Sequence, residues 1–414
     1  MVTLRFKRTL LCLCIVSLLL APFALHALTL YRALPDRICV SQNTGVVLPL
    51  CKIQDSSSAA PVCRSNITQQ AGGVMLNTAN VGSYELDVRL FGFLPLKKVS
   101  VSVYENGYVL PGGETIGIRI YTDGVLTVAL TDVADTNGKS VSPAKASGLQ
   151  VGDVLLSLNG QKIVDADHFS DLLSTADGSP VTIEYVRAGE KYTLTLTPAK
   201  TQSGYKIGAW VRDSTAGLGT LTFVRPDKGV YAALGHGIAD IDTAQLLTVL
   251  DGNIAPCEIT AVVPGEKGTP GQLCGTFAQG IYGSVLSNSG AGIYGLWSAK
   301  KHPASTPVPV ASRFEIHEGE AKLRFAPDGK NVQEFTVQIE KVLTAAGDEK
   351  GMVIRITDPA LLEITGGIVQ GMSGSPILQN GKLVGAVTHV FVNDPTRGYG
   401  IFAELMMDKT EKIK

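Results

Sequence analysis

The 414-residue sequence predicts a mainly β protein of two to three domains. Glycine is unusually frequent, at 45 residues, and short apolar runs rich in Val, Ile and Thr lie between Gly, Pro, Asn and Asp, as in strands and turns. Hydrophobic residues make up 45% of the chain and charged residues 18%, which excludes a largely disordered protein. The 36 basic and 37 acidic residues nearly balance, so the sequence predicts no nucleic-acid partner.

Residues 1–31 predict a cytoplasmic tail and a transmembrane anchor. Three basic residues precede an apolar run from Leu10 to about Leu30, which is long enough to cross a bilayer core. The positive-inside rule keeps the N-terminus in the cytoplasm and exports the rest of the chain. A cleaved signal peptide is the alternative, because the small residues Ala24 and Ala27 lie near the end of the run.

Residues 32–110 predict a linker followed by a small β region. From Arg32 to about Gln70 the composition is that of a loop, and we expect a stalk. Alternation of apolar and polar residues from Tyr84 to Leu90 and from Val99 to Val103 predicts strands.

Residues 111–200 predict a PDZ-like domain on the evidence of one long motif. Ser142–Gly160 reads as a short helix, a Gly-Leu-x-x-Gly-Asp turn, a buried strand and an Asn-Gly turn, and resembles the core of a PDZ domain. Asp165 or Asp167 is expected to cap a helix over His168–Ser174, and a hairpin closes the module.

PDZ domains bind an extended peptide by strand addition and hold its terminal carboxylate on backbone N–H groups. The expected cradle is the turn between the first two strands of the module, made by Thr122, Asp123, Gly124 and Val125. The Asp123 carboxylate is unfavourable beside a bound carboxylate. The alternative is a structural β module without a ligand.

Residues 201–414 predict an antiparallel double β-barrel. This part of the chain is strand-rich with many glycines, and no long amphipathic helix precedes its last fifteen residues. Its length of about 210 residues fits that architecture.

Gly371–Pro376 is the strongest chemical signal, because it reads Gly-Met-Ser-Gly-Ser-Pro. A nucleophilic Ser373 needs a tight turn that exposes its Oγ, and backbone N–H groups that point where an oxyanion develops. Gly371 permits the unusual dihedrals that turn its own N–H, with that of Ser373, into an oxyanion hole. This pattern is typical of chymotrypsin-like serine proteases, and an ordinary hairpin turn is the alternative.

A general base has to accompany the serine, and His236 is the best candidate because Gly235 and Gly237 flank it at a strand end. His389 lies in an apolar strand, where a core or edge position is favoured. The remaining histidines belong to the apolar N-terminal run, the PDZ-like helix or polar loops.

The residues leave the orienting acid open among Asp240, Asp242, Asp251 and Asp358. Asp240 and Asp242 follow the histidine too closely to reach back to its ring easily. Asp358 precedes Ser373 by fifteen residues, near enough for adjacent strands to converge. The cysteines form no CxxC pair, so the sequence predicts no metal site, and it predicts no cofactor.

With this order of residues the chain resembles the stage IV sporulation protein B family, the membrane-anchored, PDZ-containing serine peptidases of endospore-forming bacteria. The resemblance runs from the anchor to near Met407 and is carried by Pro111–Gly117, Gly208–Phe223, Gly235–Ile238, Gly366–Pro376 and Gly385–Pro395. It implies His236 as the base, Asp358 as the orienting acid and Ser373 as the nucleophile.

The resemblance also implies a function and a location. The protein is expected to cleave itself in trans and to cleave a membrane-bound regulator of an intramembrane metalloprotease, which signals late mother-cell sigma factor activation in sporulation. It is expected to be a single-pass protein of the forespore membrane, with its body between forespore and mother cell. Its PDZ domain would bind its own N-terminal region or its partner.

Two other functions remain as alternatives. One is a non-catalytic PDZ adaptor of an exported membrane complex, in which the C-terminal barrel is a scaffold. The other is a quality-control protease of the periplasmic heat-shock type, which is disfavoured because there the PDZ domain follows the protease domain.

Overall fold

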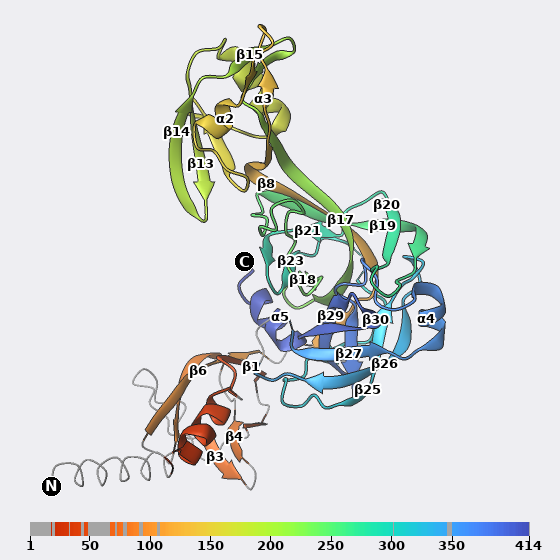
Figure 1. Ribbon diagram of the computed structural model, residues 1–414. Coiled ribbons are helices and arrows are strands. Elements are labelled where there is room, and N and C mark those ends of the chain that lie inside the picture. The colour runs from red at the N-terminus through yellow and green to blue at the C-terminus, as the bar shows by residue number, and fades with distance from the viewer. Residues whose placement is uncertain are drawn as a thin grey trace, which may run out of the picture.

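The computed structural model describes residues 18, 21–32, 34–42, 45–48, 67–70, 73–77, 81–90, 94–105, 108–300, 302–345 and 350–413. These residues form a mainly β protein with an N-terminal lobe, a central body of strands and a PDZ-like module at the far end (Figure 1). The predicted β class is therefore confirmed.

The N-terminal lobe contains a three-stranded sheet. β1 (Arg37–Ser41) pairs parallel to β6 (Leu94–Tyr104), which pairs antiparallel to β5 (Gly82–Leu90). The two strands predicted in this region are confirmed as β5 and β6. The expectation of a stalk from Arg32 is wrong for β1, whose Ile38 side chain is fully buried in the core of this sheet.

A second small sheet completes the lobe, with β4 (Gly73–Asn77) between β2 (Gly45–Leu48) and β3 (Ile67–Gln70). Residues 18 and 21–30 of the predicted apolar run are described, and residues 21–32 form a helix; the rest of the predicted anchor lies outside the described residues. In the part of the chain that the structure describes, no helix combines the length and the apolar character needed to cross a membrane. The anchor therefore stays a prediction.

The PDZ-like module is confirmed in its main elements. α3 begins after Asp165, whose carboxylate accepts a hydrogen bond from His168 N at 2.7 Å, and the β13–β14 hairpin turns at Ala188 and Gly189, which both have positive φ. The elements are β9 (Val133–Ala134), β10 (Ser140–Val141), α2 (Pro143–Ala146), β11 (Val154–Leu158), β12 (Gln161–Lys162), α3 (Ala166–Thr175), β13 (Val181–Arg187), β14 (Glu190–Leu196), β15 (Ala199–Thr201) and β16 (Gly204–Lys206).

Two long antiparallel strands, β8 (Thr115–Leu130) and β17 (Ala209–Arg225), connect this module with the body (Figure 1). The predicted pair of strands joined by a turn at Asp123 and Gly124 is wrong, because β8 continues through both residues. A Cβ at Gly124 would lie 2.2 Å from Leu155 O, so the glycine allows close approach of β11 rather than a turn.

The first half of the body belongs to a 14-stranded sheet, which also contains strands of the PDZ-like module. Its main row of paired strands has the order β14-β13-β11-β8-β17-β18-β23-β22, and the other strands of the sheet pair with members of this row or with one another. Residues 115–121 of β8 pair with β17 and β19 in the body. The predicted boundary at 111 puts all of β8 in the PDZ-like domain and that at 201 puts all of β17 in the peptidase domain, whereas both strands run through both units. The remaining strands of this part are β7 (Tyr108–Pro111), β18 (Val230–Ala233), β19 (Asp251–Val263), β20 (Gln272–Phe277), β21 (Gly283–Ser284), β22 (Ser287–Ser289), β23 (Gly292–Leu296) and β24 (Val308–Pro309).

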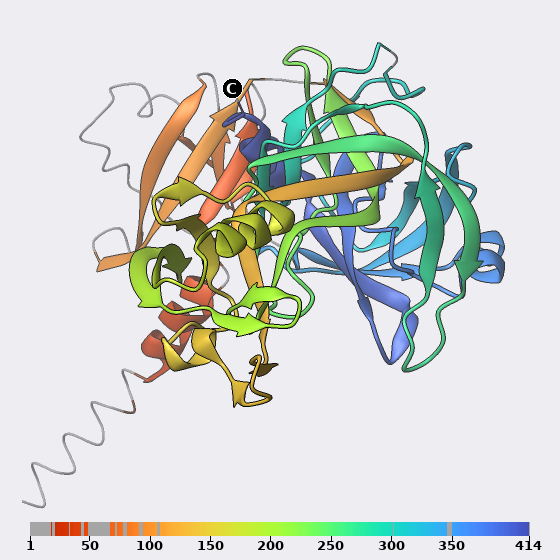
Figure 2. The same cartoon turned by 90° about the horizontal axis from the view of Figure 1, so that it is seen from above.

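The second half of the body is a closed six-stranded barrel in the order β25-β26-β27-β30-β29-β28. Figure 2 shows its blue strands and the orange N-terminal sheet on opposite sides of the molecule. The predicted double barrel is thus confirmed in part, since the described body combines one closed barrel with the open 14-stranded sheet. The elements are β25 (Gly319–Phe325), β26 (Gln333–Val342), β27 (Met352–Ile356), α4 (Pro359–Thr365), β28 (Pro376–Gln379), β29 (Lys382–Phe391), β30 (Asp394–Phe402) and α5 (Ala403–Thr410).

Helix α5 ties the N-terminal lobe to the body. Its Glu404 forms a fully buried ion pair with Arg313, and its Asp408 binds Arg37 of β1 at 2.9 Å. Cys39 of the same strand is buried in the main core cluster. Cys39 and the other two described cysteines are free thiols.

Candidate active site

The turn that carries Ser373 is fixed by β17, which runs beside it. Thr220 N donates to Ser373 O at 2.9 Å, and the buried Thr220 hydroxyl donates to Gly371 O at 2.8 Å. The hydroxyl of Thr222 donates to Gly374 O at 2.8 Å. Both threonines are inaccessible to solvent, so these bonds hold the turn in one conformation.

Gly371 is required by the turn. Its φ is +101°, which disfavours any residue with a side chain, and a Cβ there would lie 2.8 Å from Leu273 Cδ1. The predicted need for glycine before the serine therefore has a direct structural reason.

The backbone N–H groups of Gly371 and Ser373 donate no hydrogen bond to any of the described residues. The neighbouring N–H groups are all engaged: those of Gln370, Met372 and Gly374 donate to backbone carbonyls at 2.8, 3.1 and 2.8 Å. Both residues with available N–H groups line the same pocket. Two available donors on one turn are the chemical requirement for binding an oxyanion.

His236 lies just after β18, where the chain takes a left-handed path. Leu234 and Gly235 have φ values of +72° and +73°. The His236 Nδ1 atom lies 2.9 Å from Gly237 O, a carbonyl that can only accept. Nδ1 therefore carries the proton, which leaves Nε2 unprotonated in the neutral ring and able to accept a proton.

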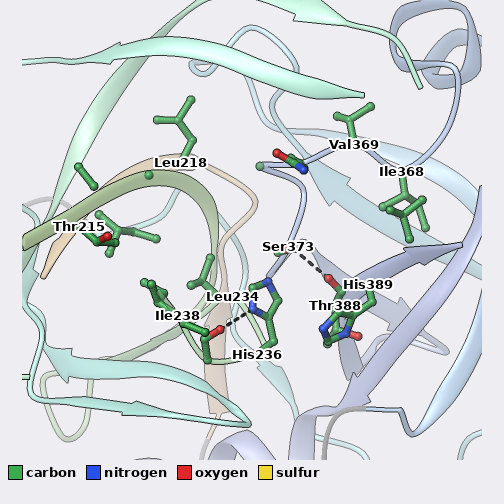
Figure 3. A pocket seen from close by; sticks show the side chains of 18 residues that line it. Thr215, Leu218, Leu234, His236, Ile238, Ile368, Val369, Ser373, Thr388 and His389 are labelled. Atoms are coloured by element: carbon green, nitrogen blue, oxygen red, sulfur yellow. Dashed lines mark hydrogen bonds between the residues drawn. The ribbon is translucent and has the colours of Figure 1, made fainter. Parts of the chain in front are cut away.

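A pocket of about 460 Å³ is lined by His236, Ser373 and Gly371. Figure 3 shows His236 and Ser373 in this pocket. The Ser373 hydroxyl donates to Thr388 O at 3.0 Å rather than to the histidine. The rest of the lining is mainly apolar, and no Asp, Glu, Lys or Arg of the described chain belongs to it. The apolar members include Ile118, Leu218, Leu234, Ile368, Val369 and Val390.

His389 also lines the pocket, although its sequence context favoured a core or edge position. Its ring centroid lies 5.1 Å from that of His236, at an interplanar angle of 39° (Figure 3). Sequence reasoning missed both His389 and Thr388, because an apolar strand pattern does not show which of its residues border a cavity. The sequence contains no local signal that separates them from the rest of β29.

Asp358 does not lie in this pocket. It is the N-cap of α4, where its Oδ1 accepts hydrogen bonds from Ala360 N at 3.0 Å and Leu361 N at 3.4 Å. Its Oδ2 accepts from Thr336 N at 3.0 Å. This bond, with those from α4, holds the pKa of the carboxyl below its usual range despite partial burial. The structure therefore brings His236 and Ser373 together but not Asp358.

The other candidate acids are engaged elsewhere. Asp240 is buried and binds Arg212 at 2.5 Å, and Asp242 binds the same guanidinium at 2.9 Å. Asp251 starts β19 and accepts a hydrogen bond from Gly252 N. Of the described residues, no three or more His, Cys, Asp or Glu side chains cluster as metal ligands would.

The predicted peptide cradle, Thr122, Asp123, Gly124 and Val125, does not lie at a free strand edge. Val125 is fully buried and pairs with β11, while the Thr122 hydroxyl donates to Gly124 O and to a backbone carbonyl of β17. Asp123 forms an ion pair of 2.9 Å with Lys162, which offsets its charge. This position does not support the predicted carboxylate site.

A free strand edge lies nearby on β17. Within the described chain, residues 209–212 of β17 pair with β8 alone, so their other edge is open. Helix α3 lies beside this part of the strand, and its Ala166 N donates to Asp213 Oδ2 at 2.9 Å. An edge next to a helix is the geometry that strand addition requires.

Two regions of the chain match known protein families. Residues 203–407 match the family model described as SpoIVB peptidase S55, and residues 136–187 match that of the PDZ domain. A curated relative from Pseudomonas savastanoi pv. phaseolicola, named "Probable periplasmic serine endoprotease DegP-like", is 45% identical over 121 residues, which are 28% of this chain and 23% of the relative. Zinc metalloprotease RasP from Shouchella clausii is 30% identical over 112 residues, 26% of each chain. The chain spans about a quarter of the length of these relatives.

Two solved structures are also similar to parts of the chain. The Rv3671c protease from M. tuberculosis, in its active form, is 15% identical, with a TM-score of 0.30 over 48% of this chain and 74% of that one. The PDZ domain of an SdrC-like protein from Listeria monocytogenes is 22% identical, with a TM-score of 0.17 over 22% of this chain and 87% of that one. Both TM-scores are too low to establish a common fold.

Proposed function

Because the chain is a SpoIVB-like serine peptidase with a PDZ domain, we propose that it hydrolyses peptide bonds as an endopeptidase, with Ser373 as nucleophile and His236 as general base. The observation that carries this proposal is the turn at Gly371–Ser373. Two backbone N–H groups without an acceptor among the described residues, a serine hydroxyl and an imidazole meet there in one pocket. Acyl transfer needs this combination of groups.

The reaction would proceed in two stages. Ser373 Oγ leaves Thr388 O, attacks the scissile carbonyl carbon and transfers its proton to His236 Nε2. The N–H groups of Gly371 and Ser373 donate to the oxyanion, and His236 then protonates the leaving amine nitrogen. In the second stage water attacks the acyl carbonyl carbon and gives a proton to His236. The bond to Ser373 Oγ then breaks, Oγ takes this proton back from His236, and the product with the new carboxyl group leaves.

The hydrogen bond from His236 Nδ1–H to Gly237 O would orient the imidazole ring for this reaction. The family resemblance gives that role to Asp358, and this remains a prediction. It requires the Asp358 carboxylate to give up three backbone N–H groups and to reach the pocket.

The finer function follows the family resemblance. The protein would cleave itself in trans and cut a membrane-bound regulator of an intramembrane metalloprotease, and so signal late mother-cell sigma factor activation in sporulation. It would act from the forespore membrane, with its body in the space between forespore and mother cell. Its PDZ domain would bind its own N-terminal region or its partner, and the open edge of β17 beside α3 supports a peptide ligand.

The test uses the full chain and a fluorophosphonate probe, in which a serine Oγ displaces fluoride from phosphorus. Wild-type protein should be labelled and should cleave a tagged Ser373→Ala chain. Labelling and cleavage should both be lost when the enzyme itself carries Ser373→Ala or His236→Ala. The control is Ser375→Ala, because the hydrogen-bond partner of that buried hydroxyl among the described residues is the Thr220 hydroxyl, at 3.5 Å. Undiminished self-cleavage by Ser373→Ala would refute the assignment, and absence of labelling in the wild type would favour the adaptor alternative.

A further inference from the structure

Arg212 lies on the strand that joins the PDZ domain to the active-site pocket. Residues 209–212 of β17 border α3 with an open edge, and residues 215–218 of the same strand line the pocket. The pairing with β8 is interrupted between Arg212 and Ser214, at the point where β17 leaves the PDZ domain. The neighbouring Asp213 binds the first turn of α3 through Ala166 N.

The Arg212 guanidinium extends from this strand to the loop that carries His236. Its Nη1 lies 2.5 Å from Asp240 Oδ2 and its Nη2 lies 2.9 Å from Asp242 Oδ2. The Asp240 side chain is fully buried, whereas that of Arg212 is 36% exposed. Burial raises the pKa of Asp240, but the hydrogen bonds from Thr243 and Arg212 outweigh it and lower the pKa overall.

Asp240 in turn closes the loop that follows His236. Its Oδ1 accepts hydrogen bonds from Asp242 N, Thr243 N and the Thr243 hydroxyl at 3.0, 2.9 and 3.1 Å. Asp240 N donates to Gln245 O at 2.9 Å. The carboxylate is therefore the centre of a turn that begins four residues after the histidine.

Asn288 fixes the base of the same loop. Its side chain accepts from Ile238 N and donates to Ile238 O and Leu247 O, each at 2.8 Å. Asn288 thus fixes the loop two residues after His236, and the turn at Asp240, whose buried charge is paired with Arg212, fixes it two residues further on.

We propose that Arg212 and Asp240 are positioning residues that hold His236 for catalysis and couple its position to the PDZ domain. The inference rests on the proposed peptidase function. A buried carboxylate that loses its cation cannot remain where it is without a large cost, so the turn has to rearrange. A peptide that adds to the open edge of β17 would act on the same strand and would bias the position of Arg212.

The test measures fluorophosphonate labelling of Ser373 in the full chain, resolved into a binding constant and a maximal rate. Arg212→Met should lower the maximal rate by about 10- to 100-fold with little change in binding, because a misplaced base costs about that much. Arg212→Lys keeps the cation and should restore most of the rate. Asp240→Asn, which keeps the shape of the side chain, should be as slow as Arg212→Met, and the two changes together should be no slower than either alone.

Arg187→Met is the matched control. Arg187 also pairs a partly exposed guanidinium with a buried carboxylate, that of Asp153, at 2.6 Å, but it lies inside the PDZ domain. It should lower the melting temperature as Arg212→Met does and leave the labelling rate unchanged. Equal labelling rates in Arg212→Met and Arg187→Met would overturn the proposal. Wild-type protein that is not labelled at all would instead contradict the peptidase function itself.

The coupling to the PDZ domain has its own variant, Asp213→Ala, which removes the acceptor of Ala166 N from β17. In an otherwise wild-type protein, Asp213→Ala should slow the labelling of Ser373 by at least about threefold, which is within the range of measured coupling effects. In the Arg212→Met background the same change should have no further effect. Equal slowing in both backgrounds would show that the signal does not pass through Arg212.

Discussion

Asp358→Asn distinguishes a helix cap from a catalytic acid. In the structure, the two Asp358 oxygens accept hydrogen bonds from Thr336 N and from the first turn of α4. Asparagine caps helices as well as aspartate, but it has only one acceptor oxygen, so the bond to Thr336 is lost. We expect a local destabilisation of about 1 kcal/mol for asparagine and about 2 kcal/mol for Asp358→Ala, which also loses the cap.

Hydrogen exchange of the Thr336 N–H measures the loss of its bond in Asp358→Asn, and exchange of the segment Pro359–Thr365 measures the loss of the cap in Asp358→Ala. About 1 kcal/mol corresponds to roughly fivefold faster exchange. The folded-state pKa of Asp358 is lowered, so its contribution is fully present above the unfolded value of about 3.9. It is lost as the pH falls through the folded pKa. The difference between wild type and Asp358→Asn should therefore be complete at neutral pH and shrink in acid.

Activity provides the second measurement for the same variant. Asp358→Asn should label with the fluorophosphonate to within about threefold of the wild type, since a residue outside the pocket adds nothing to transition-state stabilisation. Loss of an orienting carboxylate would instead cost about 10⁴-fold. A loss of that size with normal exchange in α4 would refute the reasoning and would show that Asp358 moves to His236 in the active state.

Three further predictions concern the pocket and the thiols. Gly371→Ala should slow labelling by about 100-fold, the cost of one oxyanion donor, whereas Gly381→Ala, also at positive φ but in open space, should lower only the melting temperature. The pocket lining has no Asp, Glu, Lys or Arg in the described chain, so a peptide library should show about tenfold preference for an uncharged apolar residue on the acyl side of the cut; preference for lysine or aspartate would contradict it. Native protein at pH 8 should be alkylated at the half-buried Cys274 before the buried Cys257, whose pKa burial raises to about 11, as peptide mass spectrometry would reveal.

The sequence predicted the parts of the molecule that depend on local chemistry. The Gly-x-Ser-Gly-x-Pro turn requires its glycines for backbone geometry, and Gly371 has the positive φ that this implies. The cap at Asp165 was also predictable, because an N-cap acts on the next three residues of its own helix.

Prediction failed where tertiary pairing decided the outcome. Asp123-Gly124 is a common turn sequence, but pairing with β11 and β17 on either side keeps β8 extended. The residues leave the acid open and the resemblance implies Asp358, although Asp before Pro at a helix start is also a capping signal. Chain order cannot decide between these roles, because it does not give the distance between Asp358 and His236.

The continuity of β8 and β17 has a consequence for how the chain folds. Tyr121 and Ser214 pair in the body although about 90 residues separate them, and closing a flexible loop of that length costs about 4 kcal/mol of entropy. The PDZ domain between them has its own apolar core, and its pairing of Leu126 with Arg212 already brings the two strands together. If the PDZ domain folds first, the loop is already closed when the body folds. β8 and β17 are then already aligned, and this entropy no longer opposes the folding of the catalytic body.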